Sequence, residues 1–183
     1  MSLREVPIIS GQRSNLKTME IAAPFRLAMT VTVPALIMKY ISNGPDETKD
    51  IGFRLGKLLR QGDVVGLYGE LGAGKTTMVK GIADALGIDE RDIVSASFTI
   101  IAEYNTIPSF FHIDLYRIEK YDELVDLGLW DQVGDDSISV IEWAEKAEKG
   151  LPEGMIKVRL KTLGENVREI TIEGGDEKNW NNL

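Results

Sequence analysis

The stretch VVGLYGELGAGKTTMVKGIADALG, residues 64–87, decides the fold of this chain. A short apolar run with β-branched residues leads into a turn rich in glycine, and a helical pattern follows that turn. Residues 69–76, GELGAGKT, satisfy the pattern G-x-x-x-x-G-K-[ST]. Because the pattern lies between a predicted strand and a predicted helix, it indicates a loop that holds a chain of phosphate groups.

The residues of this loop have distinct chemical roles. The glycines permit the sharp turn and let phosphate oxygens approach the backbone N–H groups closely. Lys75 is expected to reach the β- and γ-phosphates, and the Thr76 hydroxyl to ligate Mg²⁺. The alternative is a chance match in a glycine-rich turn, which the flanking strand and helix disfavour. The predicted nucleotide-binding residues of the loop are Gly69, Glu70, Leu71, Gly72, Ala73, Gly74, Lys75, Thr76 and Thr77.

Beyond the loop, the hydrophobic pattern predicts strands that alternate with helices. The alternation favours a three-layer α/β domain of the P-loop NTPase-like kind, with a largely parallel sheet. The last two predicted strands form a C-terminal β-hairpin. Strands are expected at 39–42, 64–68, 100–106, 109–116, 137–143, 155–163 and 167–174, and helices within 42–63, 76–86, 121–133 and 143–150.

The regular pattern begins at Met38, which divides the chain into three parts. Residues 1–37 show no sustained period, so we expect an N-terminal extension that is loosely ordered or appended. Its apolar part, 27–38, is too short to span a membrane, and Pro34 interrupts it. Residues 38–174 form the predicted P-loop domain, and 175–183 form a polar tail.

The composition limits the partners and the compartment. The chain has no cysteine, which excludes disulfides and thiolate metal sites. With 21 Lys and Arg against 29 Asp and Glu, the net charge is −8. A broad basic face for nucleic acid is therefore not expected, and any RNA would be held mainly by a partner. A nucleotide-binding loop favours a compartment that contains nucleotides, so we expect a cytoplasmic protein.

Two acids follow apolar runs at the ends of predicted strands. Asp114 ends FFHID, and Glu142 ends SISVIE. In open α/β sheets ligands bind outside the carboxyl ends of the strands, so both carboxylates are expected near Thr76. Thr76, Asp114 and Glu142 are thus the predicted metal-side residues, and Lys75, Asp114 and Glu142 the predicted catalytic residues. Alternatively, each acid caps the next helix or pairs with a lysine.

Three further features leave their roles open. His112, the one histidine of the sequence, precedes Asp114 by two residues, so their side chains share a face of the strand. It either supports the site or is satisfied within the sheet. Trp143 follows Glu142 and belongs either to the site or to ordinary packing. Residues 95–101, SASFTII, place hydroxyls where a segment sensing the γ-phosphate would lie, although such clusters are usually plain loop.

The motifs GELGAGKTT, SASFT, HIDLYR, ELVDLGL and VIEWAE come in the order and spacing of the TsaE/YjeE family, which the chain resembles from Met38 to about Gly174. One position departs from the family pattern S-P-T-[FY]-T. Ala96 stands in place of the proline within 95–99, which is expected to loosen that loop. Residues 1–37 have no counterpart in the family pattern.

The resemblance implies a bacterial P-loop ATPase of the pathway that makes the threonylcarbamoyl modification on adenosine 37 of tRNA. It implies that ATP is bound with Mg²⁺, that hydrolysis is slow alone, and that the TsaD–TsaB pair is the partner. It further implies that hydrolysis resets that complex and that tRNA is reached through the partners. By position, Thr76, Asp114 and Glu142 match magnesium-side residues, Lys75 the phosphate contact, and Thr48 the region near the base.

Other functions share this loop. A small-molecule kinase usually adds an arginine-rich lid, whereas the chain after Glu142 offers mainly lysines. A nucleotide-sensing adaptor without significant hydrolysis would have the same loop and differ in the chemistry of Glu142. A GTPase would carry N-K-x-D, which is absent, and the D-x-x-G match at 131–134 lies in a predicted helix.

Overall fold

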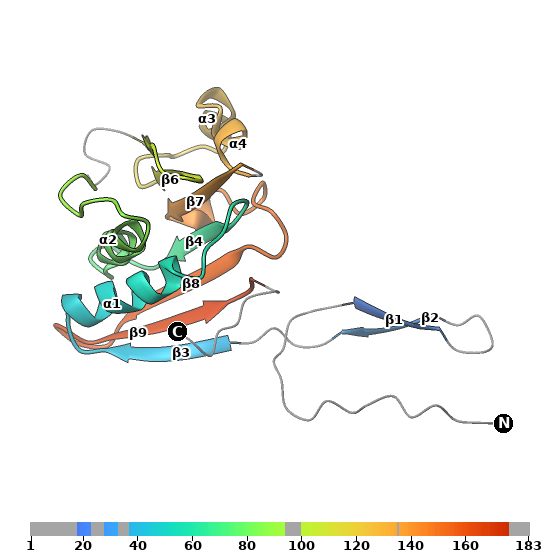
Figure 1. Cartoon of the computed structure of the whole chain (residues 1–183), viewed down its shortest axis with the longest axis horizontal. Helices are drawn as coiled ribbons and strands as arrows, with labels where there is room; N and C mark the ends of the chain where they lie inside the picture. Colours follow the sequence, from blue (N-terminus) through green and yellow to red (C-terminus); the bar gives the residue numbers. More distant parts are fainter. Residues whose placement is uncertain (1–17, 23–27, 33–36, 94–99, 135, 176–183) are drawn as a thin grey trace.

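The computed structural model describes residues 18–22, 28–32, 37–93, 100–134 and 136–175 (Figure 1). Within these residues the strands form two separate sheets, one of two strands and one of seven. The small sheet pairs β1 (Thr18–Ala22) with β2 (Ala28–Thr32) in antiparallel register. The large sheet carries the helices and the phosphate-loop motif.

The seven-stranded sheet has the order β3-β9-β8-β4-β7-β6-β5. Its central strands β8, β4, β7 and β6 run parallel, whereas the pairs β3–β9, β8–β9 and β5–β6 are antiparallel. The predicted sheet is therefore confirmed as parallel at its centre, and the predicted C-terminal hairpin is β8–β9. The strands are β3 (Ile37–Ser42), β4 (Val64–Tyr68), β5 (Ile101–Tyr104), β6 (Ser109–Asp114), β7 (Ser137–Glu142), β8 (Ile156–Thr162) and β9 (Arg168–Glu173).

Helices cover both faces of this sheet and make the predicted three layers. On one face, α1 (Pro45–Gly56) and α2 (Lys75–Ala85) pack over a core that includes Val65 and Leu67 of β4. On the other, α3 (Asp122–Asp126), α4 (Leu129–Gln132) and the 3-10 helix η1 (Ala144–Lys146) cover Val64 and Tyr68. Successive β4 residues thus face opposite layers, which explains why the whole strand is buried and apolar.

The contact between α1 and α2 is backbone to backbone. A Cβ atom at Gly81 would lie 2.0 Å from the Lys49 carbonyl oxygen, and one at Gly52 would lie 2.4 Å from the Met78 carbonyl oxygen. No side chain fits at either position without moving a helix. This contact fixes α2, and α2 carries the end of the phosphate-loop motif at its first turn.

Three of the four predicted helices are shorter than the sequence pattern indicates, whereas α2 has the predicted length and begins one residue earlier. The predicted helix within 42–63 ends at Gly56, and Leu59, although buried, lies in the turn that follows. The predicted helix at 121–133 is divided by Gly128, whose φ of 62° lies in the left-handed region. Only η1 forms within 143–150. A positive φ cannot continue a right-handed helix, so Gly128 interrupts the helical pattern.

The N-terminal part differs from expectation in one respect. The pattern of residues 1–37 predicted no regular element, yet the structure contains the β1–β2 pair. The pairing of two strands depends on a partner that periodicity does not reveal. The main sheet begins at Ile37, one residue before the predicted start. The predicted γ-phosphate-sensing loop at 95–99 and the tail beyond Gly175 lie outside the described residues.

Candidate functional site

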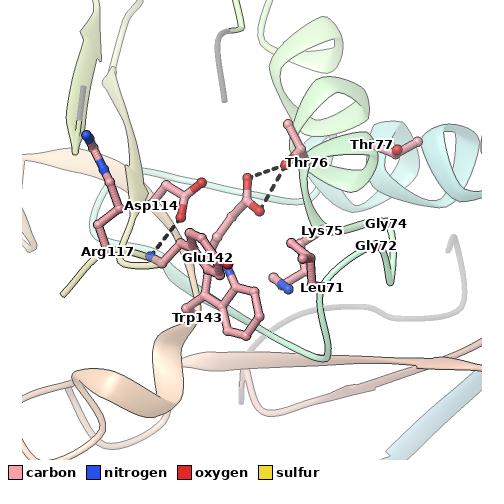
Figure 2. Close-up of a pocket in the computed structure, with 11 residues that line it drawn as sticks. Leu71, Gly72, Gly74, Lys75, Thr76, Thr77, Asp114, Arg117, Glu142 and Trp143 are labelled. Atoms are coloured by element: carbon pink, nitrogen blue, oxygen red, sulfur yellow. Dashed lines mark hydrogen bonds between the residues drawn. The ribbon is translucent and has the colours of Figure 1, made fainter. Parts of the chain in front are cut away.

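The loop between β4 and α2 is shaped by three glycines with positive φ. Gly69, Gly72 and Gly74 have φ angles of 144°, 77° and 100°, which side chains rarely adopt. At Gly69 a Cβ atom would also lie 2.4 Å from the Leu160 carbonyl oxygen. The chain therefore turns sharply from the end of β4 into α2, which begins at Lys75 (Figure 2). The N–H groups of the first turn of a helix have no partner within that helix, so an anion at the loop can accept from them.

A cavity of about 560 Å³ lies between this loop and the carboxyl ends of β6 and β7. Its size is that of a site for a small molecule or a cofactor. The predicted residues Lys75, Thr76, Thr77, Asp114 and Glu142 all reach it. The lining residues are Leu71, Gly72, Gly74, Lys75, Thr76, Thr77, Asp114, Tyr116, Arg117, Glu142 and Trp143 (Figure 2).

Lys75 is buried and held from two sides. Its Nζ donates hydrogen bonds to the carbonyl oxygens of Gly69 at 2.7 Å and Glu70 at 3.0 Å. The Nζ also lies 3.5 Å from the centroid of the Trp143 ring. Burial lowers the pKa of Lys75, and the charges of nearby carboxylates, Glu142 foremost, act in the opposite direction. Gly69 and Glu70 thus serve the site by orienting the ammonium group.

Glu142 is the centre of a buried hydrogen-bond network. The Thr76 hydroxyl donates to its carboxylate, with Oγ1 2.9 Å from Oε1 and 3.0 Å from Oε2. Nε2 of His112 lies 3.0 Å from the same Oε1, and both side chains are at most 3% exposed. Glu142 was expected near Thr76, and the two side chains are hydrogen-bonded. His112, whose role was open, contacts Glu142.

Asp114 lies beside Glu142 at the end of the neighbouring strand. The two residues are paired in the parallel register of β6 and β7. The Asp114 carboxylate is buried, and its Oδ1 accepts a hydrogen bond from the backbone N–H of Tyr116 at 3.0 Å. This bond fixes the carboxylate at the rim of the cavity on which Lys75 and Thr76 converge.

Ala73 and Thr48, two of the predicted nucleotide-binding residues, do not line this cavity. Ala73 is 1% exposed and its side chain belongs to the hydrophobic core. Thr48 is buried, and its hydroxyl is 2.8 Å from the Ser42 hydroxyl. Thr48 also lines a second cavity, of about 210 Å³, on the other side of the loop. That cavity is lined by Gly44, Pro45, Thr48, Gly72, Gly74, Thr77, Asn166 and Arg168.

Sequence reasoning missed one contribution to the loop, from Arg168, and left the role of Trp143 open. Arg168, on β9, donates from Nη2 to the Gly72 carbonyl oxygen at 3.3 Å and from Nη1 to carbonyl oxygens of its own hairpin. Trp143 adopts φ 60° and ψ 41°, and its ring covers Lys75. Arg168 is remote from the loop in sequence, and a single tryptophan gives no signal of positive φ. Only the fold reveals either contact.

The order of the strands, the strand–loop–helix unit and the acids at neighbouring strand ends define a P-loop NTPase-like fold with its site at the loop. A family model described as "Threonylcarbamoyl adenosine biosynthesis protein TsaE" matches residues 42–170. The chain belongs to this TsaE family, as its motifs predict.

Several relatives agree with this assignment. The chain is 42% identical over 136 residues to a protein of Bacillus subtilis named tRNA threonylcarbamoyladenosine biosynthesis protein TsaE, with 74% of this chain and 84% of the relative covered. It is 38% identical over 135 residues to a Treponema pallidum protein of the same name, with 74% and 99% covered. The crystal structure of Bacillus subtilis YdiB superimposes with a TM-score of 0.59 at 35% identity, covering 76% of this chain and 86% of that one.

Proposed function

We propose that this protein binds ATP with Mg²⁺ in the 560 Å³ cavity and hydrolyses it in support of the threonylcarbamoyladenosine modification of tRNA. The observation that carries the proposal is the convergence of Lys75, Thr76, Asp114 and Glu142 on one cavity beside a loop of glycines with positive φ. These groups come from different elements of the fold, and together they supply cation, hydroxyl and carboxylates to a phosphate chain.

The phosphate end of the nucleotide is assigned to the loop. Backbone N–H groups and the first turn of α2 attract anions, and the Lys75 ammonium adds a full charge. Residues 69–77 are the proposed binding segment, with Ala73 contributing through its backbone. The base is assigned to the side of Thr48, because Gly72, Gly74 and Thr77 line both cavities and so connect the two.

The donors present fit Mg²⁺. The Thr76 hydroxyl oxygen and two carboxylates, Asp114 and Glu142, are oxygen ligands of the kind this ion takes. No cluster of three or more His, Asp or Glu side chains able to hold a metal occurs among the described residues. Mg²⁺ commonly binds through one or two carboxylates together with substrate phosphates, so this donor set suits it. When bound, the ion would neutralise charge that develops on the phosphate oxygens.

The catalytic roles follow from position. Lys75 binds the phosphate oxygens. Glu142 orients the attacking water or completes the coordination of Mg²⁺, and Asp114, which lies beside Glu142, also coordinates Mg²⁺. Among the described residues that line the cavity, Arg117 is the only arginine, and its side chain is exposed. Its side chain points away from Lys75 and Glu142 in Figure 2. An arginine on the transferring phosphate is worth about 10³–10⁵ in rate, so slow turnover is expected alone.

The proposed partners are the TsaD and TsaB proteins. Membership in the TsaE family supports this pathway, and the net charge of −8 supports contact with tRNA through the partners rather than directly. No helix in the described residues has the length and apolar character to cross a membrane. The cytoplasm is the proposed location, because nucleotide and tRNA are both present there.

The test is a measurement of phosphate release by the purified chain alone, then with the TsaD–TsaB pair, then with tRNA added. The proposal requires slow Mg²⁺-dependent hydrolysis of ATP that increases with the partners. Phosphate transfer to an added small molecule would favour a kinase instead. Nucleotide binding with no hydrolysis under any of the three conditions would favour a sensing adaptor.

A further inference from the structure

Trp143 has an unusual backbone. Among the described residues, Trp143 is the only one other than glycine that has a positive φ. It directly follows Glu142 at the end of β7. A bulky residue in the left-handed region is strained, and such strain persists only where the surroundings impose it. The turn sends the indole into the cavity next to Lys75 (Figure 2).

The indole also contacts a second aromatic ring. The Tyr116 ring lies 5.2 Å from it, centroid to centroid, at an angle of 44°. Lys146, on η1, donates to the backbone carbonyl oxygens of Tyr116 and Ile118. The segment after β6 and the helix after Trp143 are therefore tied together, and the Tyr116 ring packs on the indole.

The Trp143 ring and a phosphate group would compete for the same side of the Lys75 ammonium group. An ammonium group has three N–H donors, and two of them point to the carbonyl oxygens of Gly69 and Glu70. The Trp143 ring, 3.5 Å from Nζ, covers the side that remains. A phosphate oxygen would approach Nζ to about 2.8 Å, and it would need that same side. The ring and the phosphate cannot both occupy it.

We propose that Trp143 controls access of the terminal phosphates to Lys75. The indole covers the ammonium group through a cation–π contact and leaves it when a phosphate group binds. The two carbonyl bonds keep Lys75 in position during this exchange, so the ring moves and the lysine stays. This inference rests on the proposed nucleotide site, and it assigns to Trp143 a part in setting phosphate affinity.

Tryptophan emission tests the movement of the ring. The chain has three tryptophans, so the double variant Trp130→Phe, Trp180→Phe retains Trp143 alone. Its emission should change on saturation with MgATP or MgADP, and should change much less with AMP, which lacks the terminal phosphates. Calorimetry on the same samples measures binding independently. In parallel, the nucleotide-dependent emission of the parent chain should disappear in Trp143→Leu.

Affinity tests the competition itself. Trp143→Leu removes the aromatic face and keeps an apolar side chain, so its Kd for MgATP should fall about threefold or more, as expected for loss of a close cation–π contact. Trp143→Phe should be intermediate. Trp130→Phe is the matched control, because Trp130 stacks on Tyr121 outside the cavity, and its Kd should equal that of the parent.

The outcomes separate this inference from the proposed function. Calorimetric binding of MgATP without any change in Trp143 emission would overturn the inference alone. Weaker binding by a Trp143→Leu protein that melts like the parent would also overturn it, because the ring would then support the phosphate. If Trp143→Leu fails to fold, two other measurements test the inference: the emission of the single-tryptophan variant and the Kd of Trp143→Phe for MgATP. Absence of calorimetric binding by the parent would instead overturn the proposed nucleotide site.

Discussion

At the scale of single residues, Glu142 occupies the most constrained position of the cavity. It is buried and bonds both Thr76 and His112. Removing its carboxylate with Glu142→Ala would leave the buried Nε2 of His112 without this partner, at about 1–3 kcal/mol. Glu142→Gln retains an acceptor oxygen and similar volume while removing the charge. The Gln variant is therefore the sharper probe of function.

Lys75→Met should weaken ATP binding by about tenfold to a hundredfold. A hydrogen bond to a charged group contributes about 1.5–3 kcal/mol, and methionine retains the apolar stem of the buried side chain. The midpoint of thermal unfolding should change little. Lys80→Met, on the same helix, is the control. Calorimetric titration measures the Kd of each variant for ATP. A Kd of Lys75→Met equal to that of the parent would remove Lys75 from the phosphate site.

Thr76→Val should reduce the contribution of Mg²⁺ to nucleotide binding, whereas Thr77→Val should leave that contribution intact. The residues are adjacent on α2, but the hydroxyl that reaches Glu142 belongs to Thr76. Asp114→Asn should likewise reduce the contribution of Mg²⁺ to nucleotide binding. ATP is titrated with Mg²⁺ and again with EDTA. The metal assignment is wrong if Thr76→Val and Asp114→Asn keep the parent's Mg²⁺ dependence.

Sequence reasoning located residues that converge on the cavity, but it did not reveal the contacts that support them. The pattern at 69–76 and the acids at strand ends led to the residues that converge on the cavity, because strand ends meet at one edge of a parallel sheet. Sequence could not reveal that Trp143 turns into the left-handed region, or that Arg168 reaches Gly72 from a distant hairpin. Those contacts depend on tertiary structure alone.

At the scale of elements, the close crossing of α1 and α2 determines the position of the loop. Periodicity located both helices, but it gave no indication that Gly52 and Gly81 permit their backbones to touch. It also joined α3 and α4 into one helix, since an amphipathic pattern continues across Gly128 while the backbone does not. Element type was thus easier to predict than element ends, which depend on local backbone geometry.

Gly81→Ala should lower the free energy of unfolding by about 1–3 kcal/mol, the usual cost of inserting a methyl group into a fully packed contact. Its Cβ would lie 2.0 Å from a backbone oxygen, so a helix must move. Gly44→Ala is the control, because a Cβ there meets nothing within 4 Å. Denaturant unfolding compares the two, and equal stability of both variants would contradict the account of this crossing.

At the scale of the whole molecule, the domain comprises the seven-stranded sheet and its helices. In the described residues β1 and β2 pair with each other, and β3 is the first strand of the large sheet. The family model begins at residue 42. The boundary near Met38 remains a prediction, and the region before it is a proposed appendage.

A chain that begins at Met38 should fold and bind MgATP about as tightly as the full chain. The truncation leaves the β3–β9 pairing from Met38 to Ser42 in place. Thermal melts with and without MgATP should shift by no more than a few degrees. Insolubility, or a loss of several kcal/mol, would mean that residues 1–37 pack on the domain, since total stability is only about 5–15 kcal/mol.

Glu142 is proposed to act in ATP hydrolysis that the partner proteins stimulate. Steady-state phosphate release by the parent chain, Glu142→Gln and Lys75→Met, each with and without the TsaD–TsaB pair, tests it most directly, with a calorimetric Kd for each variant. The parent should be slow alone and faster with the pair. Glu142→Gln should lose the stimulated rate while its Kd for MgATP changes far less than that of Lys75→Met. Unchanged stimulated turnover in Glu142→Gln would contradict the account.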